Sequence, residues 1–308
     1  DEKIVRYNTI GKEELDAGDV IFKGSIPTSF FYSLNAAKLY LKANIFMHKI
    51  LEDIFSNKEL KIYSKKPYDQ ILFKLPTIAI QLAYILKTGR YILFKIYRKL
   101  ISRHLKWNVA YQYSKNWKDA VIWKSKIVKN PTNRFLADPF LFNYGGKDFC
   151  FVEDYNCSLK KGLISVFEIN QSKETNIEIV LDESFHLSYP FIFDHNEQIY
   201  MCPETSEIRE VRLYKCLDFP LKWELEKVLL SDISAVDSNI FMHENKWWLL
   251  TNIDTSNSGD HCSELHLYSS DDLLSDKWVP HPLNPIIFDS EKARNGGLIF
   301  EKDKIYRV

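Results

Sequence analysis

Acidic side chains recur at fixed positions of a repeated pattern in the second half of this chain. Three copies of the pattern end in a phenylalanine, at Phe142, Phe193 and Phe241. The residues that lie four positions before or eleven positions after these phenylalanines are Asp138, Tyr189, Asp237, Glu153, Glu204 and Asn252. Carboxyl groups that crowd one pocket raise one another's pKa, so one can stay protonated while another is ionised. The pattern therefore indicates general acid–base chemistry, provided that the fold brings these positions together.

The elements that would bring them together are the strands of a repeated sheet. Each phenylalanine is followed by a polar turn and then by an apolar, aromatic run such as Trp247–Leu250. A weaker fourth copy ends at Phe300, so the spacings between copies are 51, 48 and 59 residues. Repeats of this length are typical of β-propeller blades, whose inner strands begin beside one central axis. The sequence therefore predicts a mainly β fold, a five-bladed β-propeller that is complete or incomplete within this chain, with an acidic cluster at its axis.

Three domains are predicted along the chain. Residues 1–56 contain short strand-like segments and, from residue 33, apolar positions at helical spacing, which predicts a small α+β segment. Residues 57–105 contain a second helical pattern at 76–101 and are expected to form a basic helical linker. After this linker the apolar residues alternate as they do in strands, so the propeller is assigned to residues 106–308.

Composition and charge exclude several functional classes. The chain has 308 residues, of which 45% are hydrophobic, and 41 basic residues balance 41 acidic ones. This charge balance gives no overall field that would attract nucleic acid. The five cysteines lack metal-ligand spacing, so no metal site is predicted, and they fit a reducing cytoplasm. Because the chain begins with neither Met nor a signal peptide, we expect a fragment of a longer cytoplasmic protein.

The predicted helix at 76–101 has two interpretations. Its apolar run is interrupted by Gln81 and by basic residues in its second half, so it is too short to cross a bilayer. A basic helix with aromatic residues could lie on an anionic membrane surface, which would make the protein membrane-associated. The alternative is a helical linker that packs on its own neighbours, with Lys and Arg side chains keeping it in solution.

The segment Leu15-Asp16-Ala17-Gly18-Asp19-Val20-Ile21 resembles a motif of the formyltransferases that use formyl-tetrahydrofolate. By this resemblance Asp16 matches the catalytic aspartate, which orients a histidine and helps to manage the proton lost by the attacking amine. The Asn and His that this family also needs would precede residue 1. The resemblance implies the C-terminal remnant of a formyltransferase-like domain, with formyl-tetrahydrofolate as cofactor of the complete upstream domain only. By its residues alone, the segment is an acidic turn before a strand.

A second resemblance covers residues 107–308. The segments that carry it are Phe135-Leu136-Ala137-Asp138-Pro139-Phe140, Leu187-Ser188-Tyr189-Pro190-Phe191, Cys202-Pro203-Glu204, Leu221-Lys222-Trp223-Glu224-Leu225 and Ser234-Ala235-Val236-Asp237. They are similar to the N-terminal domain of the glucosamine inositolphosphorylceramide transferase family, which is similar in turn to five-bladed furanosidase-type glycoside hydrolases. The resemblance implies that Asp138 matches the hydrolases' base or nucleophile and that Asp237 matches the residue that tunes their acid. The acid itself, a Glu on the fourth blade, is missing here, and Arg294 in the fourth copy suits an anionic group.

These observations define the candidate site. The predicted catalytic residues are Asp138, Asp237 and Glu204, and the predicted substrate-binding residues are Glu153, Tyr189, Arg294, His186 and Asn252. We expect a carbohydrate-active domain that binds and processes or transfers a sugar in bacterial glycan or glycoconjugate biosynthesis, with a sugar, nucleotide-sugar or glycolipid substrate. The alternative is a non-catalytic sugar-recognition module that positions substrate for an attached formyltransferase or glycosyltransferase domain. A plainer interpretation of the aspartates, as turn residues before Pro139 and Ser238, also remains open.

Overall fold

The described chain forms two compact units. The computed structural model describes residues 5–9, 20–60, 62, 75–100, 107–170, 176–302 and 304–308. The first unit comprises residues 1–105, 255–260 and 288–291, and the second comprises residues 106–254, 261–287 and 292–308. The two short segments of the first unit come from the β-rich part of the sequence, and the repeat pattern does not predict where they belong.

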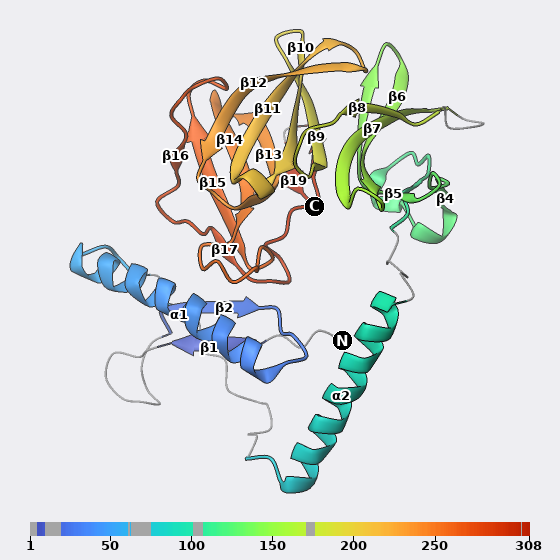
Figure 1. The fold of residues 1–308 in the computed structure, drawn as a ribbon. Helices are drawn as coiled ribbons and strands as arrows, with labels where there is room; N and C mark the ends of the chain where they lie inside the picture. Colours follow the sequence, from blue (N-terminus) through green and yellow to red (C-terminus); the bar gives the residue numbers. More distant parts are fainter. Residues whose placement is uncertain are drawn as a thin grey trace. The chain divides into compact units, whose positions relative to one another are not determined.

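The first unit combines a strand pair with two long helices (Figure 1). The strands β1 (Val5–Thr9) and β2 (Phe22–Ile26) are antiparallel. The helices are α1 (Tyr32–Phe55) and α2 (Ile78–Leu100), which confirms the two helices predicted from apolar spacing. In the part of the chain that the structure describes, no helix is long and apolar enough to cross a membrane.

Three aromatic rings form the core of the first unit. Phe22 of β2 stacks on Phe46 of α1 with ring centroids 4.6 Å apart, and the Phe288 ring lies 4.1 Å from that of Phe46. The buried Lys42 ammonium lies 3.7 Å from the Asp260 carboxylate. The segments 255–260 and 288–291 therefore belong to this unit because they supply Asp260 and Phe288 to its interior.

The second unit contains five antiparallel sheets that follow one another along the chain (Figure 1). The three larger sheets consist of β5 (Arg134–Tyr144), β6 (Lys147–Asn156), β7 (Lys161–Ile169) and β8 (Glu178–Leu181), then β9 (Ser188–His195), β10 (Gln198–Thr205), β11 (Glu210–Asp218) and β12 (Lys222–Ser231), and then β13 (Ala235–His243), β14 (Lys246–Ile253), β15 (Glu264–Ser270), β16 (Val279–Pro280) and β17 (Ile287–Phe288). The two smaller sheets pair β3 (Ala110–Tyr111) with β4 (Lys126–Ile127) and β18 (Leu298–Glu301) with β19 (Lys304–Arg307). Short 3₁₀ helices lie at Trp117–Asp119, Ile122–Lys124 and Ser206–Ile208. The mainly β prediction is confirmed, while the number of propeller blades stays a prediction.

Tight hairpins join the first two strands of each larger sheet. In all three hairpins the two turn residues have positive φ, and these residues are Gly145 and Gly146, Asn196 and Glu197, and Glu244 and Asn245. Two successive residues with φ > 0 are characteristic of type I′ turns, whose twist matches that of the paired strands. These turns are the polar segments that separate the apolar runs of each sequence repeat.

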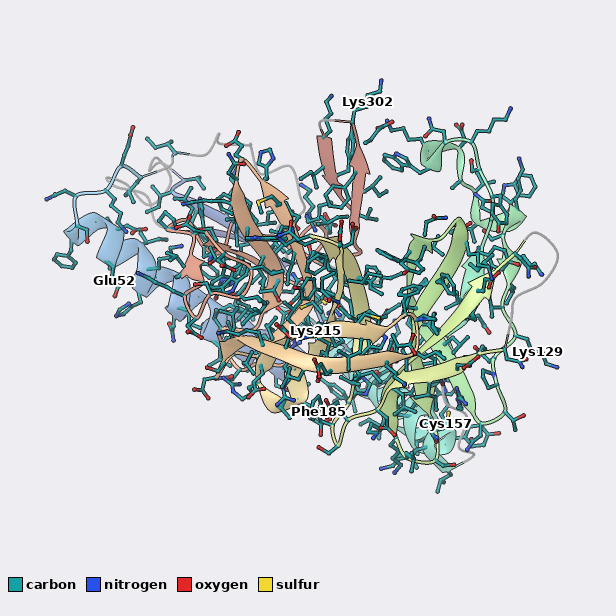
Figure 2. The ribbon with its side chains drawn as sticks, turned by 90° about the horizontal axis from the view of Figure 1, so that it is seen from above. Glu52, Lys129, Cys157, Phe185, Lys215 and Lys302 are labelled. Carbon is teal, nitrogen blue, oxygen red and sulfur yellow. The ribbon has the colours of Figure 1, made fainter. Side chains whose placement is uncertain are left out.

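The five sheets pack against one another in chain order, with an apolar cluster at each interface. Pairs that represent the four clusters are Val128 with Phe167, Phe151 with Met201, Leu213 with Leu249, and Leu265 with Leu298. Figure 2 shows side chains filling the spaces between these sheets, with Lys302 at the tip of the β18–β19 hairpin. Trp223, Trp247 and Trp278 contribute to two of these clusters, so these tryptophans pack between sheets.

Truncation of Leu249 tests the cluster between the second and third larger sheets. Leu249 is fully buried, so Leu249→Ala should lower the free energy of unfolding of the second unit by about 2 to 5 kcal/mol through lost burial and a residual cavity. All seven tryptophans lie in the second unit, so tryptophan fluorescence during urea unfolding reports on it alone. The matched variant Leu225→Ala, at a side chain that is 44% exposed, should have a much smaller effect. Equal effects of the two substitutions would contradict this packing.

Candidate functional site

Three strand pairs hold the candidate residues in the same register. The cross-strand pairs are Ala137 with Glu153, Ser188 with Glu204, and Val236 with Asn252. In each sheet a β-bulge lies directly beside this pair. The sequence repeat therefore corresponds to one pairing register that occurs three times. The first residue of each bulge is the one that the sequence predicted to face the site.

The first residue of each bulge has a left-handed backbone. The φ angles of Asp138, Tyr189 and Asp237 are 45°, 46° and 52°. This conformation costs a non-glycine residue on the order of 1 to 3 kcal/mol and is concentrated at functional sites. A bulge also bends its strand and redirects the side chain. The same strained geometry in three successive sheets therefore marks the predicted repeat position as a site where side-chain direction matters.

Four carboxyl groups from these three sheets line one cavity. The cavity has a volume of about 490 Å³ and is lined by Trp107, Asn108, Val109, Ala137, Asp138, Pro139, Glu153, Ser188, Glu204, Asp237 and Arg294. Asp138 and Glu153 come from the first larger sheet, Glu204 from the second and Asp237 from the third. Arg294 is the one basic side chain in this lining, so the cavity is acidic.

Asp138 and Glu153 form a hydrogen-bonded pair of carboxyl groups. Burial raises the pKa of Glu153 to about 8, and the neighbouring carboxylates of Asp138 and Glu204 add to the rise. Burial also raises the pKa of Asp138, against a hydrogen bond from the Tyr189 backbone. The hydrogen bond between the two carboxyls raises the pKa of Glu153 and lowers that of Asp138. At neutral pH Glu153 therefore holds the proton and donates, and Asp138 accepts.

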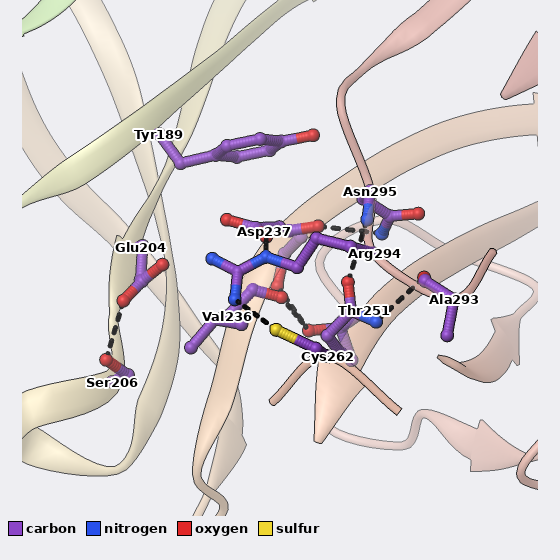
Figure 3. Close-up of polar contacts among 12 residues, drawn as sticks. Tyr189, Glu204, Ser206, Val236, Asp237, Thr251, Cys262, Ala293, Arg294 and Asn295 are labelled. Carbon is purple, nitrogen blue, oxygen red and sulfur yellow. Dashed lines mark hydrogen bonds and ion pairs between the residues drawn. The ribbon is translucent and has the colours of Figure 1, made fainter. Parts of the chain in front are cut away.

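Glu204 is a second carboxyl group whose pKa lies close to neutral pH. Burial raises its pKa to about 7, and the charge of Asp237 adds to this rise. The Ser206 hydroxyl donates a 2.8 Å hydrogen bond to Glu204 Oε1, which favours the ionised form and limits the rise (Figure 3). A carboxyl with a pKa near the working pH can both give and take a proton, as a general acid or base must.

Asp237 is ionised and paired with Arg294. The Arg294 Nε contacts Asp237 Oδ2, and the guanidinium also reaches Cys262 Sγ at 3.9 Å (Figure 3). Burial raises the pKa of Asp237 to about 6, against the attraction of Arg294. The Arg294 side chain is 47% exposed, so part of its guanidinium remains accessible to an anionic group of a ligand.

Buried polar groups hold the loop that carries Arg294. The Asn252 amide donates to the backbone carbonyls of Glu264 and Ala293 at 2.9 and 2.8 Å, and its oxygen accepts from the Asn295 backbone N–H at 3.0 Å. The Asn295 amide donates to the backbone carbonyl of Asp237 at 2.8 Å. From β19, the Arg307 guanidinium donates to the backbone carbonyl of Arg294 at 2.9 Å. The loop is therefore tied to the strand that carries Asp237.

His186 contacts the Glu153 carboxyl group. Its Nδ1 accepts a 2.9 Å hydrogen bond from the Gly162 backbone N–H, so Nε2 carries the proton of the neutral ring and faces Glu153 Oε1 at 3.6 Å. Burial lowers the pKa of His186, which favours this neutral form. Gly162 permits the close approach, because a Cβ there would lie 2.2 Å from the Leu187 carbonyl oxygen and 2.7 Å from His186 Cε1.

The structure brings five of the nine predicted residues into the cavity, namely Asp138, Glu153, Glu204, Asp237 and Arg294. The other three described residues lie outside the lining. Tyr189 is buried with its hydroxyl 3.2 Å from Asn239 Oδ1. His186 contacts Glu153, and Asn252 is buried against the loop that carries Arg294. Asp16 lies outside the described residues.

Sequence reasoning missed Trp107 and Asn108, which line the cavity just before the first sheet. They lie outside the repeats, so no periodic signal could identify them, and the Trp107 side chain is exposed. Among the described residues, no three His, Cys, Asp or Glu side chains are arranged to hold a metal ion.

Residues 102–308 match a family model described as the N-terminal domain of glucosamine inositolphosphorylceramide transferase 1. Curated relatives with the name Glucosamine inositolphosphorylceramide transferase 1 occur in Arabidopsis thaliana and Oryza sativa subsp. japonica. The first is 39% identical over 183 residues, or 58% of this chain and 24% of the relative. The second is 40% identical over 175 residues, or 55% of this chain and 23% of the relative. This chain therefore spans about a quarter of the length of these relatives.

Two solved structures illustrate a partial likeness to this chain. The Bacteroides ovatus protein Xyloglucan PUL GH43B is 12% identical with a TM-score of 0.43, over 58% of this chain and 39% of that chain. A levansucrase variant of B. megaterium is 12% identical with a TM-score of 0.43, over 52% of this chain and 56% of that chain.

The proton on Glu153 makes the stability of the second unit depend on pH. Burial raises the pKa of Glu153 from its ordinary 4.5 to about 8 in the native state, so the folded protein holds a proton that the unfolded chain releases. The free energy of unfolding should therefore fall as the pH rises from about 5 to about 8, by about 1.4 kcal/mol for each unit of pKa shift at most. Glu153→Gln imitates the protonated form and should flatten this slope in urea unfolding followed by tryptophan fluorescence. Glu197→Gln, at an exposed hairpin turn, should leave the slope as it is, and an unchanged slope in Glu153→Gln would contradict the assignment.

Replacement of Gly162 by Ala tests the close packing that places His186 beside Glu153. In Gly162→Ala the new methyl group would overlap the Leu187 carbonyl oxygen, so the second unit should lose about 1 to 3 kcal/mol of stability. The same tryptophan-detected unfolding measures the loss. The control is Gly89→Ala in α2, where a Cβ meets no atom within 4 Å and the tryptophan transition should stay unchanged.

Proposed function

This chain belongs to the family of glucosamine inositolphosphorylceramide transferase N-terminal domains, and from that premise we propose that residues 106–308 form a carbohydrate-active domain. In this proposal the acidic cavity binds a sugar and performs glycosyl chemistry on it. The observation that carries the proposal is the convergence of Asp138, Glu153, Glu204 and Asp237 on one cavity with different protonation states. Paired carboxyl groups of which one is protonated and another ionised are the usual machinery for breaking or forming a glycosidic bond.

The protonation states suggest a role for each carboxyl. Glu204, whose pKa is about 7, donates a proton to the oxygen of the leaving group. The Asp138 carboxylate either bonds to the sugar carbon, forming a glycosyl ester that an acceptor hydroxyl later displaces as it returns a proton to Glu204, or takes the proton of an acceptor hydroxyl whose oxygen bonds to that carbon. The hydrogen bond from protonated Glu153 orients Asp138. The leaving group departs with the proton from Glu204, so charge and protons balance in either course. Asp237 stays ionised and holds Arg294 at the wall of the cavity.

A propeller architecture would explain why these groups converge. We regard the five successive sheets as blades, the first and last of which are represented here by two strands each. Contacts between the two ends of the second unit support a closed ring. The Trp117 and Tyr306 rings lie 5.6 Å apart, and Lys118 Nζ lies 3.1 Å from Glu301 Oε2, so the segment after β3 meets the β18–β19 hairpin. In such a ring, the first strand of every blade begins beside the common axis.

The proposed substrate class is a sugar carried by a nucleotide or a glycoconjugate. A cavity of about 490 Å³ has the size of ordinary small-molecule sites, and Arg294 offers a partner for a phosphate or another anionic substituent. The name of the curated relatives refers to glucosamine and inositolphosphorylceramide. Because this chain spans only about a quarter of those relatives, we carry over the class of substrate and not its identity.

A second candidate function is sugar recognition without chemistry. The observation that favours it is Arg294, which occupies the fourth repeat where a further carboxyl would complete an acid–base set. A domain of this kind would bind a glycan and present it to a catalytic domain elsewhere in a longer protein.

Replacement of Asp138 distinguishes the two candidates. A glycan array probed with the full 308-residue chain identifies a bound sugar, and the matching nitrophenyl glycosides then report turnover through released nitrophenolate. If the domain is an enzyme, Asp138→Asn should lower kcat by roughly 10²- to 10⁴-fold while sugar binding persists. Asp194→Asn, at an exposed hairpin residue, serves as the matched control. Binding without turnover by the unmodified chain would establish the recognition module, and absence of binding to any sugar would overturn both.

A further inference from the structure

Helix α2 has an apolar stripe that the described part of its own unit leaves exposed. Its members are Ile78, Leu82, Ile85, Ile92, Ile96 and Leu100, and their spacings of three, four and seven residues place them on one side of the helix. Each of these side chains is between 42% and 77% exposed. No residue of α2 is buried, so the stripe presents an apolar surface about six turns long that is interrupted at Gly89.

The opposite side of α2 is fixed to the rest of the first unit. The Tyr91 ring stacks on the Phe30 ring with centroids 4.7 Å apart, and Tyr84 Oη accepts a 3.2 Å hydrogen bond from the Tyr32 backbone N–H. At 100° per residue, Tyr84 and Tyr91 lie about 120° and about 140° from the middle of the apolar stripe. The aromatic contacts therefore hold the helix with the stripe directed away from its own unit.

The charge of α2 has one sign. The helix carries Lys87, Arg90, Lys95, Arg98 and Lys99 and has no acidic residue between Ile78 and Leu100. By helical geometry Arg90 borders the stripe on one side, and Lys95 and Lys99 border it on the other. Long basic side chains can extend from such flanks toward anionic groups while their methylene stems lie on an apolar surface.

We propose that α2 binds the surface of a membrane that contains anionic phospholipids, with its axis in the membrane plane and its apolar stripe among the acyl chains. An apolar face flanked by cations is the pattern of interfacial helices, whose binding combines buried apolar area with attraction to anionic headgroups. Each Lys or Arg near such a surface adds to this attraction. The membrane contact is independent of the chemistry of the acidic cavity, which lies in the other unit.

Charge distinguishes a membrane from a second copy of this helix. Two α2 helices packed through their stripes would bring cations of both copies together, and α2 supplies no carboxylate to pair with them. Like charges across such a seam oppose association, whereas opposite charges at its edges favour it. An anionic lipid surface supplies the missing negative charge along the whole length of the helix.

Co-sedimentation with lipid vesicles tests the proposal on the full 308-residue chain. Vesicles of phosphatidylcholine mixed with phosphatidylglycerol should bind the chain about tenfold or more tightly than vesicles of phosphatidylcholine alone, and added salt should weaken this binding. The double variant Ile85→Gln with Ile92→Gln should lower binding to the mixed vesicles about tenfold or more by removing two of the apolar side chains that enter the membrane in this proposal. Arg90→Gln with Lys99→Gln should remove most of the preference for the anionic lipid.

A matched control comes from α1. Leu41 and Leu51 are each 47% exposed, so Leu41→Gln with Leu51→Gln changes the same type of side chain off the proposed surface and should bind like the unmodified chain. Circular dichroism checks that each variant keeps its helix content. Equal binding to both kinds of vesicle, or full binding by the stripe variant, would overturn the proposal. So would a dimer in light scattering that the stripe variant abolishes, if vesicles fail to bind the chain.

Discussion

A left-handed residue in the first strand of each larger sheet is the constraint on which the site depends. An ordinary strand alternates its side chains between two faces, and that alternation alone would not direct the side chains of Asp138 and Asp237 into one cavity. The bulge after Ala137 and after Val236 breaks the alternation at the required place. Aspartate tolerates this backbone through its short polar side chain. Tyr189 lacks that advantage, and it is held by the Phe140 ring at 4.7 Å and by the hydrogen bond to Asn239.

The pKa values in the cavity follow from the burial of four carboxyl groups beside one guanidinium. Burial is the largest cause of the raised pKa of every carboxyl, and Arg294 offsets it most strongly at Asp237. The result is a gradient, from Asp237 with a pKa of about 6 to Glu153 with a pKa of about 8. A site with such a gradient holds both proton donors and proton acceptors at one pH, which identical environments would not allow.

The sequence predicted the parts of this arrangement that depend on periodicity. It identified the strand pairs that place Glu153 and Glu204 opposite the bulges, because register repeats with the hydrophobic pattern. It did not predict that Asn252, at the equivalent position, would be buried, because burial is set by the loop that folds over it. Nor did it predict Trp107, which reaches the cavity from outside the repeats. Register is a local property, whereas the closing of loops over a site depends on contacts far apart in the chain.

The third repeat has Asn252 where the first two repeats have a glutamate, and the fourth repeat contributes Arg294 instead of a carboxyl group. One physical reason connects these two differences. A glutamate at position 252 would be an acceptor only, so it could not donate to the backbone carbonyls of Glu264 and Ala293 as the Asn252 amide does. Those two hydrogen bonds, with the support of Arg307, fix the loop that brings Arg294 to Asp237. A fifth carboxyl would add negative charge to a cavity that already holds four. The Arg294 guanidinium instead offsets part of this negative charge, and the Asn252 amide holds the loop that carries it.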